Sequence, residues 1–180
     1  MSIDKPQSAD FSLARGEKLL LMVRHAKSSW DIGTLNDFER SLNERGKKDA
    51  PIMAKRLFDK KIPIDNFVSS PAKRAKKTAE LFCLVYGKKE SSINYVSKLY
   101  HASVEVFYEV LEEVDDACRS VAIFSHNPGI TEFVNTLTDE KAIDNMFTCG
   151  IFAVKIGPGK WTDFKQTKKQ FLFFDYPKSG

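Results

Sequence analysis

Residues 19–30, LLLMVRHAKSSW, begin with five apolar residues and end in an arginine, a histidine and small polar residues. A continuous apolar run of this length is typical of a strand that is buried on both faces of a parallel sheet. Arg24 and His25 follow directly where this strand ends. In open α/β sheets, ligands bind beyond the carboxyl ends of the strands. The stretch therefore predicts a central strand that delivers two polar side chains to a ligand site.

Similar short apolar segments recur along the chain and alternate with helical patterns. We expect strands over 19–24, 66–69, 93–99 and 120–125. Two later apolar runs, 146–156 and 169–174, flank a turn at Gly157–Gly159 and predict further strands that pair with each other or complete the sheet. This alternation predicts an α/β fold with three layers, in which helices cover both faces of a mostly parallel sheet.

Four segments have the apolar spacing of amphipathic helices. The clearest is 71–86, with Ser70 as a capping residue, Pro71 at the first helical position and Gly87 at the end. We also expect helices over 104–118 and over 128–137, the latter capped by Asn127. The segment 43–60 contains Pro51, which predicts a kink or a late start.

Length and composition exclude several classes of protein. The 180 residues are enough for one domain, which we place at 18–180 behind a polar, flexible N-terminal extension at 1–17. No apolar run approaches the ~20 residues of a membrane span, and the N-terminus lacks a secretory signal pattern. A net charge of +4 suits an anionic ligand but is too weak for a nucleic-acid-binding protein. Three widely spaced cysteines favour reduced thiols and a cytoplasmic protein.

Polar residues follow two further strands at the same predicted edge of the sheet. Arg74 lies in the first turn of the helix after 66–69, and His126 follows 120–125 directly. Three loops therefore bring Arg24, His25, Arg74 and His126 together. Helix N-termini at both later loops add partial positive charge. The pattern predicts a phosphate-binding site.

Four short motifs carry a resemblance to a known family: RHAKSSW at 24–30, SLNERGKKDA at 41–50, SSPAKRAKKTAE at 69–80 and SHNPG at 125–129. In this order they resemble the histidine phosphatase superfamily and, within it, the short SixA-type phosphohistidine phosphatases. The resemblance extends from about residue 19 to the C-terminus. It implies a phosphoglycerate mutase-like fold.

The resemblance also implies roles for the clustered residues. His25 would be the nucleophile, with Arg24, Arg74 and His126 forming the phosphate pocket. Apart from the resemblance, Lys27 and Ser28 are substrate-binding candidates because they follow His25, and Asn127 is one because it follows His126. A neutral imidazole attacks phosphorus, and water then hydrolyses the covalent phosphohistidine. The arginines should keep His25 neutral near pH 7, whereas bound phosphate should favour a protonated His126. No cofactor or metal is expected. The expected partner is a protein phosphohistidine or a small phosphate ester.

The residue that protonates the leaving group is less well defined. Larger members of the superfamily use a glutamate after the third strand, but here no acid lies between Lys98 and Ser103. His101 is the nearest candidate, followed by Tyr100, Glu105 and Asp37. The lack of a clear proton donor favours a phosphoramidate substrate, because its P–N bond depends less on protonation of the leaving group by an acid than the P–O bond of an alkyl ester does.

Two other interpretations remain open. His25, His101 and His126 could be three zinc ligands of a metallohydrolase, although the neighbouring arginines would repel a dication. A phosphate-binding or phosphoprotein-binding module without turnover is the alternative from a different class.

Overall fold

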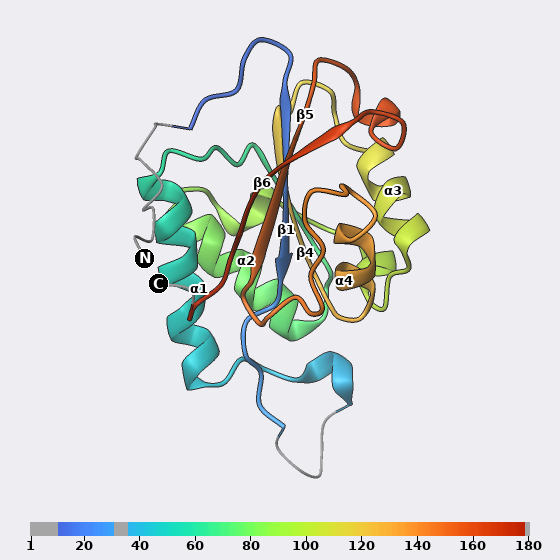
Figure 1. Cartoon of the computed structure of the whole chain (residues 1–180). Helices are drawn as coiled ribbons and strands as arrows, with labels where there is room; N and C mark the ends of the chain where they lie inside the picture. Colours follow the sequence, from blue (N-terminus) through green and yellow to red (C-terminus); the bar gives the residue numbers. More distant parts are fainter. Residues whose placement is uncertain (1–10, 31–35, 179–180) are drawn as a thin grey trace, which may run out of the picture.

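The computed structural model describes residues 11–30 and 36–178, and its centre is a six-stranded sheet (Figure 1). The strand order is β3-β2-β4-β1-β5-β6. The strands are β1 (Lys18–Arg24), β2 (Asn66–Ser69), β3 (Ile93–Tyr95), β4 (Ser120–Ser125), β5 (Ile151–Ile156) and β6 (Lys169–Asp175). The α-helices are α1 (Glu44–Asp59), α2 (Lys73–Val85), α3 (Val104–Glu112) and α4 (Gly129–Val134).

Strand β1 lies in the middle of the sheet, as its apolar run predicts. It pairs in parallel with β4, so that Leu21 lies opposite Ala122, and antiparallel with β5, where Leu21 lies opposite Ala153. Strands β2, β3 and β4 continue the parallel part, and β6 pairs antiparallel with β5. The prediction of a mostly parallel sheet is confirmed. The segments around 146–156 and 169–174 both pair with each other and complete the sheet.

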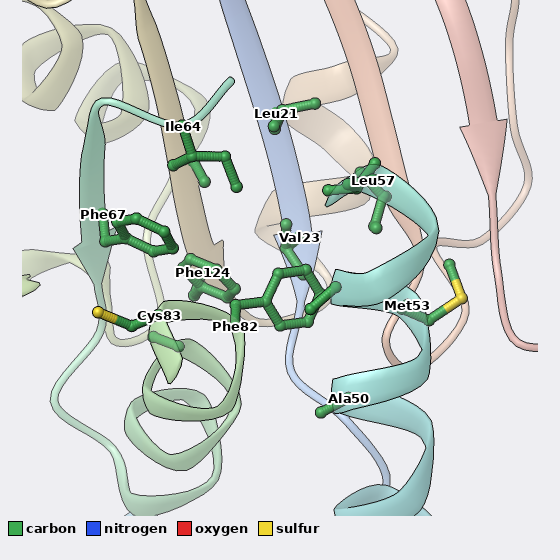
Figure 2. Close-up of a cluster of buried hydrophobic side chains, with 14 of the residues drawn as sticks. Leu21, Val23, Ala50, Met53, Leu57, Ile64, Phe67, Phe82, Cys83 and Phe124 are labelled. Atoms are coloured by element: carbon green, nitrogen blue, oxygen red, sulfur yellow. The ribbon is translucent and has the colours of Figure 1, made fainter. Parts of the chain in front are cut away.

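Successive side chains of β1 enter two separate cores, because neighbouring residues of a strand point to opposite faces. Leu21 and Val23 pack in one core with residues of α1 and α2, such as Met53 and Phe82. Figure 2 shows this core, with Phe82 lying between the sheet and α1. Met22 packs in the other core with α3 and α4. Helices therefore cover both faces of the sheet, and the three-layer prediction is confirmed (Figure 1).

The two helices on the first face follow the sequence closely. Helix α1 begins at Glu44, where the Asn43 side chain accepts a hydrogen bond from the Gly46 N–H, and it continues through Pro51. A late start was therefore the wrong expectation, since the apolar stripe on either side of Pro51 keeps the helix packed. Helix α2 begins at Lys73 rather than at 71. Gly87 ends it with a φ of 66°, a left-handed conformation that favours glycine.

Several elements are shorter than the sequence patterns predict. Strand β3 ends at Tyr95, opposite Ser69 at the end of β2, and a 3-10 helix (Ser97–Leu99) follows because β2 offers no further ladder. Helix α3 ends at Glu112 rather than 118, and the chain then turns as the Asp115 side chain accepts a hydrogen bond from Ala117 N–H.

Helix α4 is also shorter than its pattern predicts, and Asn127 does not cap it. The helix spans only residues 129–134, and its N-cap position is Pro128. Its C-terminal end is drawn away because the Asn135 side chain bonds both the N–H and the C=O of Ile143. This pair of hydrogen bonds directs the chain into segment 141–148, which borders the candidate site.

Of the predicted extension, residues 1–10 lie outside the described residues, while Arg119 binds the carbonyls of Leu13 and Ala14 just before β1. The single-domain boundary at 18–180 stays a prediction. Within 11–30 and 36–178, no helix is both long and apolar enough to span a bilayer.

Candidate active site

The loop after β1 holds His25 by its backbone from three directions. The His25 N–H donates to Ser125 C=O at the end of β4, and the Cys149 N–H donates to the carbonyls of both Arg24 and His25. The Ala26 N–H donates to the Thr78 hydroxyl, which itself donates to the Arg74 carbonyl at the start of α2. The loop that bears His25 is therefore fixed to β4, to the segment before β5 and to α2.

Hydrogen bonds define the protonation state of His25. Its Nδ1 lies 2.8 Å from the Ala26 carbonyl, which only accepts, so we assign the ring proton to Nδ1. Burial, followed by the charges of Arg74, Arg24 and Arg40, lowers the pKa of His25 to about 3, against the opposing effect of the Ala26 hydrogen bond. The ring is therefore neutral near pH 7 with an unprotonated Nε2, as a nucleophile requires.

His126 lies beside His25 at the end of β4. The ring centroids are 5.2 Å apart, and both residues are about 5% exposed or less. The His126 Nε2 lies 2.8 Å from the Ser70 hydroxyl. Ser70 was the wrong prediction for the cap of α2, because the helix begins at Lys73 and its N-cap position is Ala72. Burial is the largest cause that lowers the pKa of His126 to about 2. The ring is therefore neutral near pH 7, and the charge of a bound phosphate dianion would favour its protonated form.

Arg74 connects His25 to the outer wall of the site. Its Nε donates to His25 Nε2 at 3.2 Å, and its Nη2 donates to Asp37 Oδ2 at 2.8 Å. The Tyr100 hydroxyl donates to the same Asp37 oxygen at 2.8 Å. Burial tends to raise the pKa of Asp37, but the hydrogen bonds from Tyr100 and Arg74 outweigh it and lower the pKa. Asp37 is therefore an ionised support for the guanidinium rather than a proton donor.

Four buried nitrogen atoms of this region have no hydrogen-bond partner. Among the described residues these atoms are the complete set of buried, unpartnered side-chain nitrogens and oxygens: Arg24 Nε, Arg40 Nε, Arg40 Nη1 and His126 Nδ1. Arg40 Nε lies 3.3 Å from Asp37 Oδ1, an ionic contact without hydrogen-bond geometry. Buried donors are normally satisfied, so a cluster of exceptions calls for an explanation. An anion would supply acceptors for the three guanidinium nitrogens, and also for His126 Nδ1 when that nitrogen carries a proton.

These side chains surround a cavity of about 240 Å³. We call it the cationic cup. Its lining residues are Arg24, His25, Lys27, Ser28, Trp30, Asp37, Arg40, Arg74, His101, His126, Asn127 and Thr148. The predicted nucleophile, phosphate-pocket and substrate-binding residues are all among them, as are His101 and Asp37, whereas Tyr100 and Glu105 are not.

The secondary candidates differ in what they contact. Ser28 is buried, and its hydroxyl accepts a hydrogen bond from Arg40 at 3.1 Å. The Asn127 amide donates to Asn145 and Met146, which leaves its orientation fixed by segment 141–148. His101 is exposed, has a φ of 57°, and its ring lies 4.0 Å from that of Tyr100. Glu105, a weaker candidate for the proton donor, does not line the cup.

Sequence reasoning missed Arg40 and Thr78. Arg40 is one of 28 lysines and arginines in the chain, and nothing in its local sequence pattern marks it as a site residue. Its place depends on an antiparallel bridge between Ser28 and Leu42, which returns the chain to the His25 loop. Gly46 permits this return, because a Cβ there would lie 2.1 Å from the Lys27 carbonyl oxygen. The close approach of α1 to the loop is thus a contact between distant segments.

The site has little in common with a zinc centre. Within the part of the chain that the structure describes, no group of three histidine, cysteine, aspartate or glutamate side chains has a geometry able to hold a metal ion. All three cysteines are free thiols, and Cys83 and Cys149 are buried.

The comparisons with known proteins agree with this geometry. The family model of the histidine phosphatase superfamily (branch 1) matches residues 20–99, which include Arg24, His25 and Arg74. The predicted resemblance to the histidine phosphatase superfamily is confirmed. No curated protein matches the chain significantly. The matched span covers the first two of the three loops that form the cup and ends before His126.

Solved structures share the fold over most of the chain. A candidate phosphohistidine phosphatase SixA from Agrobacterium tumefaciens is 24% identical, with a TM-score of 0.74, over 89% of this chain and 98% of its own. The protein histidine phosphatase SixA in complex with tungstate is 21% identical, with a TM-score of 0.74, over 88% and 97%. A mycobacterial glucosyl-3-phosphoglycerate phosphatase is 15% identical, with a TM-score of 0.61, over 86% and 97%. The phosphoglycerate mutase-like fold is thereby confirmed.

Proposed function

We propose that this protein is a metal-independent phosphatase that forms a covalent phosphohistidine on His25 and acts on protein phosphohistidine. The observation that carries the proposal is that the four unpartnered buried nitrogens of the described residues belong to side chains that line one cavity with a neutral histidine. Guanidinium and imidazole donors match the equatorial oxygens of a transferring phosphoryl group, whose charge must be neutralised in the transition state.

The first chemical step uses the unprotonated nitrogen of His25. Nε2 attacks phosphorus in line, the P–N or P–O bond to the leaving group breaks, and phosphate stays attached to the ring. Arg74 Nε lies 3.2 Å from Nε2 and is therefore placed to donate to an oxygen of the entering phosphoryl group. Arg24, Arg40 and His126 receive the remaining oxygens. Water then hydrolyses the phosphohistidine and releases phosphate.

The proposed substrate class follows from the proton donors that the cup offers. Asp37 is held ionised by Arg74 and Tyr100, and burial together with the Asp37 hydrogen bond raises the pKa of Tyr100. His101 is then the remaining candidate for general acid, on an exposed position at the rim. A phosphoramidate leaving group depends least on such an acid. Protein phosphohistidine is therefore favoured over a small phosphomonoester, which stays the second candidate.

The nucleophile is tested by trapping the phosphorylated protein with a radiolabelled small phosphoramidate. We expect a label that is acid-labile and alkali-stable in the wild type and absent in His25→Ala. A label that survives acid, or that persists without His25, would contradict the mechanism. A chelator should leave turnover unchanged. Absence of any turnover with intact binding of phosphate would instead favour the non-catalytic binding module.

The substrate class is tested by comparing a phosphohistidine peptide with an alkyl monoester. We expect faster turnover of the peptide, and we expect His101→Gln to lower the alkyl ester rate by about 10- to 100-fold while changing the phosphoramidate rate much less. Faster cleavage of the alkyl ester by the wild type would overturn the preference for P–N bonds.

A further inference from the structure

The cationic cup shares one wall with a larger groove. Segment 141–148 separates the two: Asn145 and Phe147 line the groove, whereas the next residue, Thr148, lines the cup. The Asn127 amide, on the cup side, donates to Asn145 Oδ1 at 2.7 Å. Adjacent Cα atoms are ~3.8 Å apart, so the wall between the two cavities is about one residue thick. The groove has a volume of about 630 Å³.

The floor of the groove is aromatic because β6 contains an irregularity. The register between β5 and β6 shifts between Ala153 and Val154, which pair with Phe173 and Phe171 respectively. A bulge of this kind lets residues three apart share a face. Phe171 and Phe174 consequently both pack on the α3 and α4 side of the sheet, while Phe173 packs on the α1 and α2 side.

Further aromatic side chains extend this floor toward the cup. Phe147 stacks on Phe174 with ring centroids 6.3 Å apart and contacts the Tyr176 ring at 4.6 Å. Phe147 nevertheless remains 47% exposed. The charged residues of the groove, Lys141 and Asp144, have opposite signs. An uncharged, apolar group therefore fits this groove best, in contrast to the anion that fits the cup.

The size of the cup leaves most of a protein substrate outside it. About 240 Å³ holds a phosphoryl group and the ring that bears it, but no neighbouring residues of a polypeptide. We propose that the groove binds an apolar side chain of the phosphorylated polypeptide, within about three residues of the phosphorylated histidine. The proposal rests on the proposed function, and it makes segment 141–148 and β6 a docking site for the substrate protein. The occupant is assigned by continuity, since the groove opens directly beside the cup.

The experiment compares two substrates in each of three proteins. The substrates are a small phosphoramidate and a set of phosphohistidine peptides with one Phe placed at successive positions in a Gly/Ser background. The proteins are the wild type, Phe147→Ser and Phe58→Ser. Phe58 is a matched control, because it is 51% exposed and lies on α1, across the sheet from the groove.

We expect one Phe position in the peptide to raise the wild-type kcat/KM about tenfold over the all-Gly/Ser peptide, through KM, as burial of one aromatic ring predicts. Phe147→Ser should abolish this gain, Phe147→Leu should restore part of it, and Phe58→Ser should leave it intact. The rate with each peptide is divided by the rate of the same protein with the small phosphoramidate, so that a loss of active protein through partial unfolding affects both rates equally.

Several outcomes overturn the proposal while leaving the proposed function intact. One is a wild type that gains nothing from Phe at any position. Another is a Phe147→Ser variant that loses peptide and small-substrate activity in equal proportion. A dimer in sedimentation that Phe147→Ser dissociates would assign the groove to a second copy of the chain instead. Failure of the proposed function has a different signature, because the small phosphoramidate would then leave no label on His25.

Discussion

The two ends of β1 each bury a cation, but only the cation at the start of the strand is fully paired. At the start, the Lys18 ammonium donates to the carbonyls of Asp116 and Cys118, lies 3.7 Å from the Asp116 carboxylate and faces the Trp161 ring at 5.2 Å. At the end, Arg24 Nη1 binds the Met146 carbonyl, but its buried Nε has no partner. Burying an unpaired donor is costly, so a fold retains one where it serves binding. The contrast separates a structural cation from one reserved for a ligand.

The largest expected effect comes from a substitution in the cationic cup, which lies at the C-terminal end of β1. Arg74→Lys keeps the charge but removes the planar fork that reaches both His25 and Asp37. We expect kcat/KM for a phosphoramidate to fall by about 10³-fold, since a misplaced donor no longer follows the phosphoryl oxygens. Steady-state kinetics measure it, with Lys73→Ala, an exposed cation one residue away, as the control. A loss of less than tenfold would mean that charge alone suffices at this position.

The two buried histidines of the cationic cup should make the stability of the protein depend on pH. His25 and His126 have folded-state pKa values of about 3 and about 2, below the usual ~6.5 of an unfolded histidine. Below about pH 6.5 the unfolded chain therefore binds up to two more protons than the folded chain. The free energy of unfolding consequently decreases as the pH is lowered. Each such proton contributes a slope of about 1.4 kcal/mol per pH unit. Urea unfolding between pH 7 and pH 5 should show a smaller slope in His126→Asn than in the wild type, and an equal slope would refute the assignment.

A third prediction addresses the structural end of β1. Lys18→Met removes a buried charged donor and leaves two carbonyls and Asp116 without it. We expect a loss of about 2 kcal/mol in the free energy of unfolding, with unchanged activity per folded molecule. The exposed pair of Lys55 and Asp59 provides the control, because Lys55→Met should change stability by only about 0.5 kcal/mol. If Lys18→Met instead impaired turnover, the two ends of the strand would not be functionally separate.

The smallest expected effect concerns the support behind Arg74. Tyr100→Phe removes the hydroxyl that donates to Asp37 Oδ2, the oxygen that also receives Arg74 Nη2. Arg74 keeps its other contacts, and Asp37 is partly exposed to water, so we expect only a rise in KM of about three- to tenfold, the equivalent of one ordinary hydrogen bond of ~1 kcal/mol. A loss in kcat of about 100-fold would instead indicate that Tyr100 takes part in proton transfer.

The sequence predicted the elements whose signals are local. Strand β1 follows from five consecutive apolar residues, and Gly87 correctly marks the end of α2. Strand β3 and helix α4 were predicted too long, because their ends depend on where β2 stops and on the hydrogen bonds of Asn135. The aromatic floor was not predictable, since one bulge decides which face each phenylalanine of β6 occupies.

By itself, the sequence determined the order of strands and helices and the position of Arg24, His25 and His126 at strand ends, because apolar periodicity depends only on neighbouring residues. Only the tertiary structure decided which nitrogens stay unpaired, which nitrogen of His25 is free and how far its pKa falls. Those properties depend on burial and on partners that are remote in the chain, such as Arg74, 49 residues from His25. Desolvation and hydrogen bonding act through space, so no local pattern in the sequence specifies them.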